Sequence, residues 1–235
     1  MHKSIKFNSL IAAAALLLAA LPELLAQGAP VTSRNAAGYI KLTVAPWALY
    51  QVHYPLNSMD GAPVTVSDLM ADLPNGSAVF FWDAESQSYP ADEAAEVKLL
   101  GSWMPGTNNL CGRTFWLQVG NSTSSSFPIY LRGEIPDAWS MPVATNALAP
   151  SGPNTISLVG YAYPREIHWT NTTVAVSAQD GSVLAIYDAG LGKFQTSVKN
   201  NGAWSSDYIL YPGQGFWLNA RGVTNWVEVK PYLYP

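Results

Sequence analysis

Short hydrophobic runs alternate with turn signals such as NG, DG and PG along most of the chain. The runs are rich in β-branched and aromatic residues, which is typical of strands rather than helices. The first strand-like run is AGYIKLTV, at 37–44. The segment 66–72 is the exception, because it predicts a helical turn with Ser67 as its N-cap.

Four landmarks of this pattern occur twice and in the same order. The sequence LYQVHYP at 49–55 returns as LVGYAYP at 158–164, NGSAVFFWDA at 75–84 as DGSVLAIYDA at 180–189, a Gly-x-Trp at 101–103 as another at 202–204, and CGRTFWLQV at 111–119 as PGQGFWLNA at 212–220. The spacing between the copies shortens in two steps, as two short loop deletions would cause. The chain is therefore predicted to be a tandem duplication.

Each copy is predicted to form about five to seven antiparallel strands. The predicted fold class is all-β, with two tandem homologous antiparallel β-sandwich or barrel-like domains. The predicted boundaries are a signal peptide at 1–26, a flexible lead-in at 27–35, the first β-domain at 36–135, a linker at 136–153 and the second β-domain at 154–235. The linker is predicted from its Pro, Ala and Ser content and its lack of periodicity.

Strand alternation predicts which side chains enter the core. Phe115 and Leu117 in one copy, like Phe216 and Leu218 in the other, should share the buried face of a strand. The opposite face then carries a Trp beside an amide, namely Trp116 with Gln118 and Trp217 with Asn219. Such a Trp is either exposed, covered by the neighbouring domain or under a loop. The strands at 78–82 and 183–187 are apolar on both faces, which predicts a central position in the sheet.

The N-terminus predicts export. Lys3 and Lys6 precede an apolar stretch at 10–21, and small residues lead to a cleavage site after Ala26. The apolar stretch is too short to span a membrane comfortably, since a span takes roughly 20 residues. We therefore expect a protein that is secreted or held at the cell surface, without a stable membrane span after cleavage.

The order of GYI-x-LTV, a Tyr-Pro turn, (N/D)GS before an apolar strand, Gly-x-Trp and PG-x-GF-W-L resembles a group of secreted, internally duplicated β-domain proteins from Verrucomicrobia-type bacteria. The resemblance covers nearly the whole mature chain and implies duplicated β-domains without an established activity. The PG-x-GF motif is intact at 212–216, whereas the first copy reads CGRTF at 111–115.

Charge and cysteine content narrow the function classes. The formal net charge is −4, and no basic patch is visible, so nucleic acid is not an expected partner. Cys111 is the only cysteine and excludes an internal disulfide. It is either a small buried apolar residue or a thiol for an intermolecular disulfide or another reaction.

No catalytic residue, metal site or cofactor is predicted. Two histidines follow the signal peptide, His53 and His168, and they lie at non-equivalent places in the two copies. The motifs of zinc proteases, phosphate-binding loops and serine hydrolases are absent. The expectation is a protein that is not an enzyme.

One acidic segment and its basic counterpart in the second copy suggest that the protein assembles through charge contacts. The acidic residues are Asp83, Glu85, Asp92, Glu93 and Glu96. They read as a solvated loop, a weak calcium site or the carboxylate pair of a glycoside hydrolase. The matching loop of the second copy carries Lys193 and Lys199. Opposite charges at matching positions would guide domain docking or head-to-tail self-assembly.

The nine tryptophans suggest a different ligand. An exposed Trp beside an amide can stack on a sugar and bind its hydroxyls, so Trp116, Gln118, Trp217 and Asn219 form the candidate glycan site. Packing in the core, at the domain interface or between subunits is the other interpretation. The leading function is thus a secreted, non-enzymatic surface or extracellular-matrix structural protein, with a glycan-binding module second and a carboxylate-dependent glycoside hydrolase third.

Overall fold

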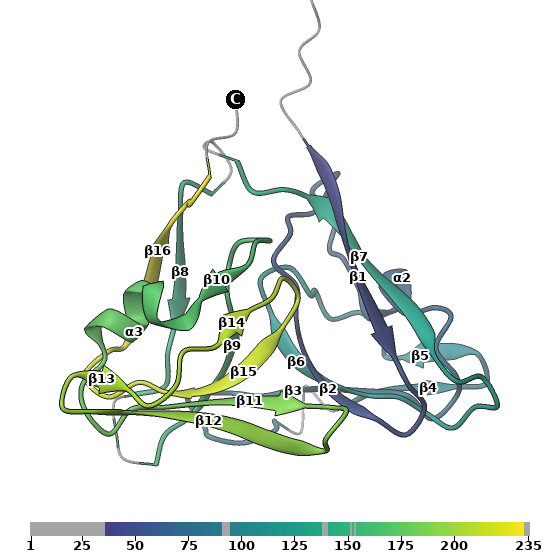
Figure 1. The fold of residues 1–235 in the computed structure, drawn as a ribbon. Helices are drawn as coiled ribbons and strands as arrows, with labels where there is room; N and C mark the ends of the chain where they lie inside the picture. Colours follow the sequence, from purple (N-terminus) through teal and green to yellow (C-terminus); the bar gives the residue numbers. More distant parts are fainter. Residues whose placement is uncertain (1–35, 91–94, 138–140, 151, 153, 233–235) are drawn as a thin grey trace, which may run out of the picture. The chain divides into compact units, whose positions relative to one another are not determined.

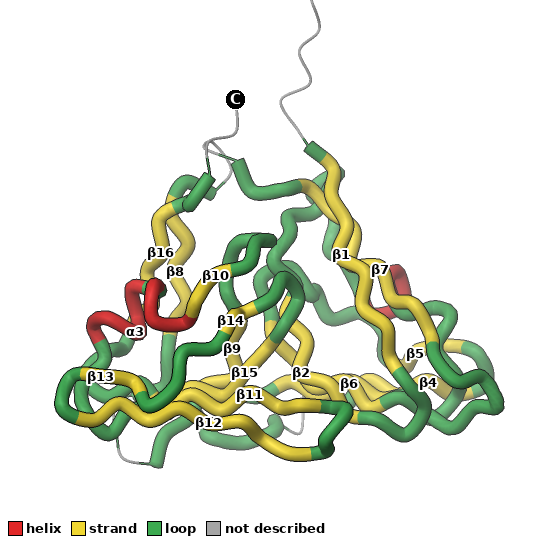
Figure 2. Tube along the Cα trace, in the orientation of Figure 1, coloured by secondary structure: helices red, strands yellow, loops and turns green. Residues whose placement is uncertain are grey.

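The structure is a computed structural model that describes residues 36–232 apart from 91–94, 138–140, 151 and 153. The predicted signal peptide and lead-in lie outside the described residues, and Asn35–Pro235 belong to one compact unit. Strands dominate, and helix is confined to short segments (Figure 2). The elements of the first half are β1 (Ala37–Val44), β2 (Leu49–His53), α2 (Val66–Leu69), β3 (Ala78–Phe81), β4 (Glu96–Leu99), β5 (Ser102–Met104), β6 (Thr114–Gln118) and β7 (Phe127–Glu134). Those of the second half are β8 (Val143–Ala147), β9 (Ser157–Gly160), β10 (Ile167–His168), η1 (Trp169–Asn171), α3 (Thr173–Ser177), β11 (Val183–Asp188), β12 (Lys193–Asn200), β13 (Ala203–Trp204), β14 (Ile209–Leu210), β15 (Gly215–Asn219) and β16 (Asn225–Val229).

Two five-stranded sheets form the framework (Figure 1). Their strand orders are β2-β6-β3-β4-β5 and β9-β15-β11-β12-β13, and every strand pair in them is antiparallel. The all-β antiparallel fold class is therefore confirmed. The strands with two apolar faces, β3 and β11, are central as predicted, because a central strand has neighbours on both edges and is covered on both faces.

The two sheets have the same internal order. Counted along the chain within each sheet, the first strand pairs with the fifth, the fifth with the second, the second with the third and the third with the fourth. Each half also has a short helix after its first sheet strand, and a separate two-stranded sheet, β1-β7 or β8-β16. Whether the halves form separate domains with the predicted boundaries stays a prediction.

Each half has its own hydrophobic core. Phe115, Leu117 and Phe216 are fully buried and Leu218 is 1% exposed, which confirms the predicted inward face. Alternation along a strand decides this burial, because successive side chains point to opposite faces.

Three local predictions need correction. The N-cap of α2 is Thr65, not Ser67, and Thr65 and Asp68 form a reciprocal capping box. The sequence analysis missed α3, where the Thr172 hydroxyl accepts a hydrogen bond from the amide of Ala175. The segment predicted to be a linker contains β8. This strand has little hydrophobic periodicity and is held in place by its pairing with β16, which is distant in sequence.

Candidate functional site: a groove along the free edge of β1

The two tryptophans of the predicted glycan site lie where the halves meet. The Trp116 ring is 6% exposed and contacts Tyr187 at a centroid distance of 5.2 Å and Trp217 at 6.4 Å. Trp217 is half-buried and packs edge-on against Trp82 at 5.0 Å. In this structure the two rings therefore pack between the halves.

The amides beside these rings do not complete a sugar platform. Gln118 is exposed, whereas Asn219 is buried and its Nδ2 donates hydrogen bonds to the carbonyls of Gly152 and Thr155. Stacking on a sugar needs an open ring face, and the Trp116 ring has almost none. The four predicted residues are thus not brought together as an exposed binding surface.

Hydrogen bonds join the halves beside this aromatic cluster. The Gln87 amide donates to the carbonyl of Ile156 at 2.9 Å and accepts from the Ile156 amide at 2.8 Å. The Trp82 Nε1 donates to the same carbonyl at 3.0 Å, and the Tyr187 amide donates to Gln51 Oε1 at 2.9 Å. These bonds fix the seam between the halves.

The charge-based assembly hypothesis fails at two of its residues. Glu96 is fully buried on β4, and its Oε1 accepts a hydrogen bond from the Asn108 amide at 2.8 Å. Lys199 is 6% exposed on β12, and its Nζ donates to the carbonyls of Ala175 and Val176. Neither residue lies on a solvated loop. The prediction of an acidic loop matched by a basic loop is therefore wrong at these two positions.

The strand register identifies the counterpart of Lys199 in the first half, because Lys199 is opposite Trp204 and Lys98 is opposite Trp103. This counterpart is Lys98 on β4, which is 5% exposed and donates to the carbonyls of Ala71 and Leu73. Lys98 therefore binds carbonyls just after α2, and Lys199 binds carbonyls in the last turn of α3, so both have a structural role. Asp83 is half-buried, Glu85 and Lys193 are exposed, and Asp92 and Glu93 lie outside the described residues.

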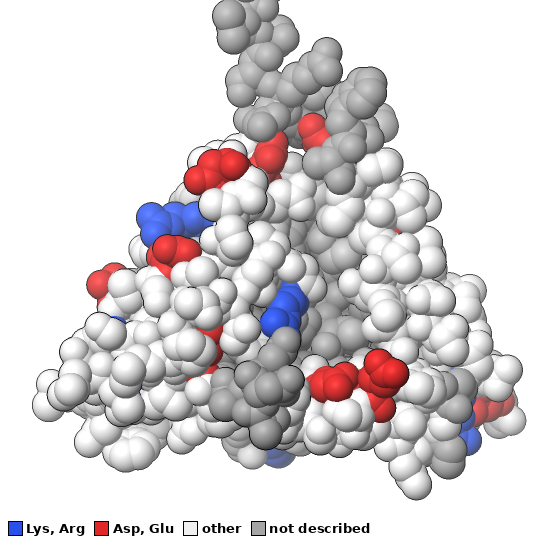
Figure 3. Space-filling model, turned by 180° about the vertical axis from the view of Figure 1, so that it is seen from behind, with Lys and Arg blue, Asp and Glu red and all other residues white. Residues whose placement is uncertain are grey.

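The remaining chemistry-bearing residues do not form a cluster. No group of three or more His, Cys, Asp or Glu side chains that could hold a metal ion occurs among the described residues. On the face shown in Figure 3, basic and acidic side chains are scattered rather than gathered in a patch. Cys111 is half-buried, and burial raises the pKa of its thiol. Within the described part of the chain, no helix is long and apolar enough to cross a membrane.

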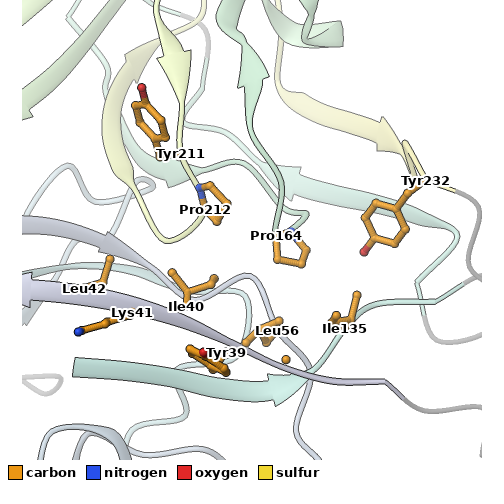
Figure 4. Close-up of a pocket in the computed structure, with 11 residues that line it drawn as sticks. Tyr39, Ile40, Lys41, Leu42, Leu56, Ile135, Pro164, Tyr211, Pro212 and Tyr232 are labelled. Atoms are coloured by element: carbon orange, nitrogen blue, oxygen red, sulfur yellow. The ribbon is translucent and has the colours of Figure 1, made fainter. Parts of the chain in front are cut away.

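A groove of about 720 Å³ lies beside β1. We call it the β1 groove. Figure 4 shows β1 and its neighbours on one side, and the turn at Tyr211 and Pro212 on the other. Its lining residues are mostly apolar, aromatic or proline, namely Gly38, Tyr39, Ile40, Lys41, Leu42, Leu56, Ile135, Pro164, Tyr211, Pro212 and Tyr232.

The hydrogen-bond register shows which backbone groups of β1 are unpaired. The amide of Ile135 donates to the carbonyl of Ala36, and the backbone of Glu134 exchanges hydrogen bonds with Asn57 instead of with β1. The residue pairs of β1 and β7 that exchange hydrogen bonds therefore begin with Gly38 and Gly133. Because such pairs alternate in an antiparallel ladder, Gly38, Ile40, Leu42 and Val44 bond to β7. The N–H and C=O groups of Ala37, Tyr39, Lys41 and Thr43 therefore point away from β7, and they find no backbone partner among the described residues.

The groove follows this free edge. Its lining includes Ile40 and Leu42, whose side chains are half-buried, and also Tyr39 and Lys41, whose side chains are exposed on the opposite face. Residues from both faces of one strand can border the same groove only at the edge of the strand. The β1 groove thus offers unpaired backbone groups beside an apolar wall.

Two aromatic side chains at the groove are open to solvent. Tyr39 is 70% exposed and packs edge-on against Tyr130, and Tyr211 is 52% exposed. The hydroxyl of Tyr232 is occupied, since it donates to the carbonyl of Pro136 at 2.8 Å. The strand-like run at 37–44 is the sequence signal for this site, but nothing in it distinguishes Tyr39, and Tyr211 and Tyr232 lie far from it in the chain.

Comparison of the chain with family models, with curated proteins and with solved structures gave no match. The candidate site therefore depends on its own geometry.

Proposed function

We propose that this protein is a non-enzymatic assembly component of a cell surface or extracellular matrix, and that it associates through the free edge of β1. The observation that carries the proposal is the coincidence of an unpaired strand edge with the apolar β1 groove. An open edge is a template for another extended chain. Main-chain hydrogen bonds supply affinity in such a pairing, and pockets for alternate side chains supply specificity.

The partner that we propose is a second copy of the chain, with its β1 antiparallel to the first. The β1-β7 sheet has two strands, and a two-stranded sheet is marginally stable on its own. Pairing of β1 with β1 would turn two such sheets into one of four strands. The contact is the same patch on both molecules, so it closes at a dimer rather than continuing as a filament.

A proline at Lys41 tests this pairing. Lys41→Pro removes one outward N–H from the free edge and leaves the bonds to β7, whereas Lys41→Thr removes the charge and keeps the N–H. The solution mass, measured by light scattering over a range of concentrations, should show a dimer for the unaltered protein and for Lys41→Thr. It should show a monomer for Lys41→Pro. A monomer for all three proteins would contradict the proposal.

Glycan binding is the second candidate, and the exposure of Tyr39 and Tyr211 at the same groove favours it. Exposed aromatic rings stack on the apolar faces of sugars. A glycan array distinguishes the two functions, because Tyr211→Ala should abolish sugar binding while Lys41→Pro leaves it intact. An array without binding to the unaltered protein would remove this candidate.

Export and duplication belong to the same proposal. Export is supported by the basic and apolar residues at 1–26. Duplication is supported by matched contacts: Asn75 Oδ1 accepts from the Gly101 amide at 2.8 Å, and Asp180 Oδ1 accepts from the Gly202 amide at 2.9 Å. A second pair is the indole of Trp103, which donates to the carbonyl of Met70, and that of Trp204, which donates to Ala175. Mass spectrometry of the protein from culture medium would test export and cleavage after Ala26.

A further inference from the structure

His53 is a buried ionisable residue with one ring nitrogen that packing does not satisfy. Its side chain is 2% exposed on β2, and its Nδ1 lies 2.8 Å from the hydroxyl of Thr114. The other ring nitrogen, Nε2, is buried and has no hydrogen-bond partner among the described residues. Buried polar atoms normally have a partner, from the protein or from a bound molecule.

Two recesses of about 250 Å³ each adjoin this histidine. Both are lined by His53, Gly112, Thr145 and Asn146, so β8 supplies their second wall. The lining of the first is mainly polar and also includes the residues Arg113, Thr114 and Ser157. We call the two together the His53 recess.

The second half keeps space for the imidazole. A Cβ on Gly160 would lie 2.2 Å from Cγ of His53, so only glycine fits beneath the ring. By the sequence match, His53 corresponds to Ala162 and Thr114 to Gly215. The histidine and its hydroxyl partner therefore occur in one copy only, whereas framework residues recur in both.

The imidazole is neutral at ordinary pH. Burial lowers the pKa of His53 to about 4, and a hydrogen bond with the backbone of Arg113 partly opposes the shift. Nδ1 is paired with the hydroxyl of Thr114, and Nε2 is the ring nitrogen that has no partner among the described residues. A ligand hydroxyl can donate to Nε2 or accept from it, so it can pair with either tautomer of the neutral ring.

We propose that the His53 recess binds a small neutral polyol or a single sugar unit, one hydroxyl of which forms a hydrogen bond with Nε2 of His53. The Asn146 side chain, half-buried in the same recess, can both donate to and accept from a second hydroxyl. No carboxylate lines the recess among the described residues, so nothing there would compensate an ammonium group. The volume fits one such unit rather than a chain.

Nitrogen-15 NMR of histidine-labelled protein tests the proposal with glucose, galactose and glycerol as probes. The Nε2 resonance of His53 should shift and saturate with at least one probe. His168 is the internal control, because its ring is exposed and its Nδ1 is 2.8 Å from Asp207, so its signals should not move.

A variant separates binding from a general solvent effect. Asn146→Ala should weaken the response about 3- to 10-fold, the loss expected for one neutral hydrogen bond. Thr43→Ala, on the exposed face of β1 outside the recess, should not change it. A His53 signal that none of the probes moves would mean that only water occupies the recess and would overturn the proposal. This test is independent of dimer formation, since the recess involves β2 and β8 and not β1.

Discussion

Replacing Phe216 with alanine tests the core of the second half. The Phe216 ring is fully buried on β15 and lies 5.9 Å from the Trp169 ring and 6.0 Å from the Trp226 ring. Phe216→Ala removes the burial of the ring and leaves a cavity between two large indoles that cannot collapse easily. The expected loss in the free energy of unfolding is about 3–5 kcal/mol. That is a large share of the roughly 5–15 kcal/mol of a typical domain.

Phe194 provides the matched control for this change. Its ring is 44% exposed and contacts Tyr187 at 5.2 Å, so Phe194→Ala removes less buried surface and creates no closed cavity. The expected loss is about 1 kcal/mol. Urea denaturation followed by tryptophan fluorescence gives both values, provided that the slope of free energy against urea is unchanged. Equal losses in the two variants would refute the assignment of Phe216 to the core.

Three further predictions concern buried polar groups. Because the folded-state pKa of His53, about 4, lies below the unfolded value of 6.5, the unfolded state takes up its proton first as pH falls. The free energy of unfolding should therefore decrease by up to about 3 kcal/mol between pH 6.5 and pH 4. The decrease should be smaller in His53→Phe. If the unfolding free energies of the two proteins change in parallel with pH, this prediction is wrong. Lys98→Met and Lys199→Met should each cost about 1–3 kcal/mol in urea denaturation, because carbonyls lose their donor; an unchanged midpoint would indicate that water replaces the ammonium. Trp82→Phe keeps an aromatic ring against Trp217 but loses the bond to Ile156, so a loss of about 1 kcal/mol is expected, and a neutral result would mean that this bond does not hold the seam.

The predictions that the structure confirms are those carried by local periodicity. The inward faces of β6 and β15 and the central positions of β3 and β11 follow from which side chains are apolar, because side chains alternate along a strand. The helical turn at α2 was predicted from a local capping signal, although its cap is Thr65 and not Ser67. The positions of charged residues did not follow from the sequence pattern in the same way. Glu96 and Lys199 were assigned to solvated loops, but both are buried on strands with hydrogen-bond partners from distant segments.

The sequence by itself determined the strands that carry the repeated landmarks and the buried faces of those strands, since both depend on residues that are near neighbours in the chain. Only the tertiary structure decided what covers the second face of each sheet and which edge stays open. Trp116 is buried because the other half packs on it, and the edge of β1 is free because its pairing ends at β7. Both outcomes depend on contacts between segments far apart in sequence. Alternation of apolar and polar residues along a strand specifies which face is buried. It does not specify which segment covers that face or which strand pairs at its edge.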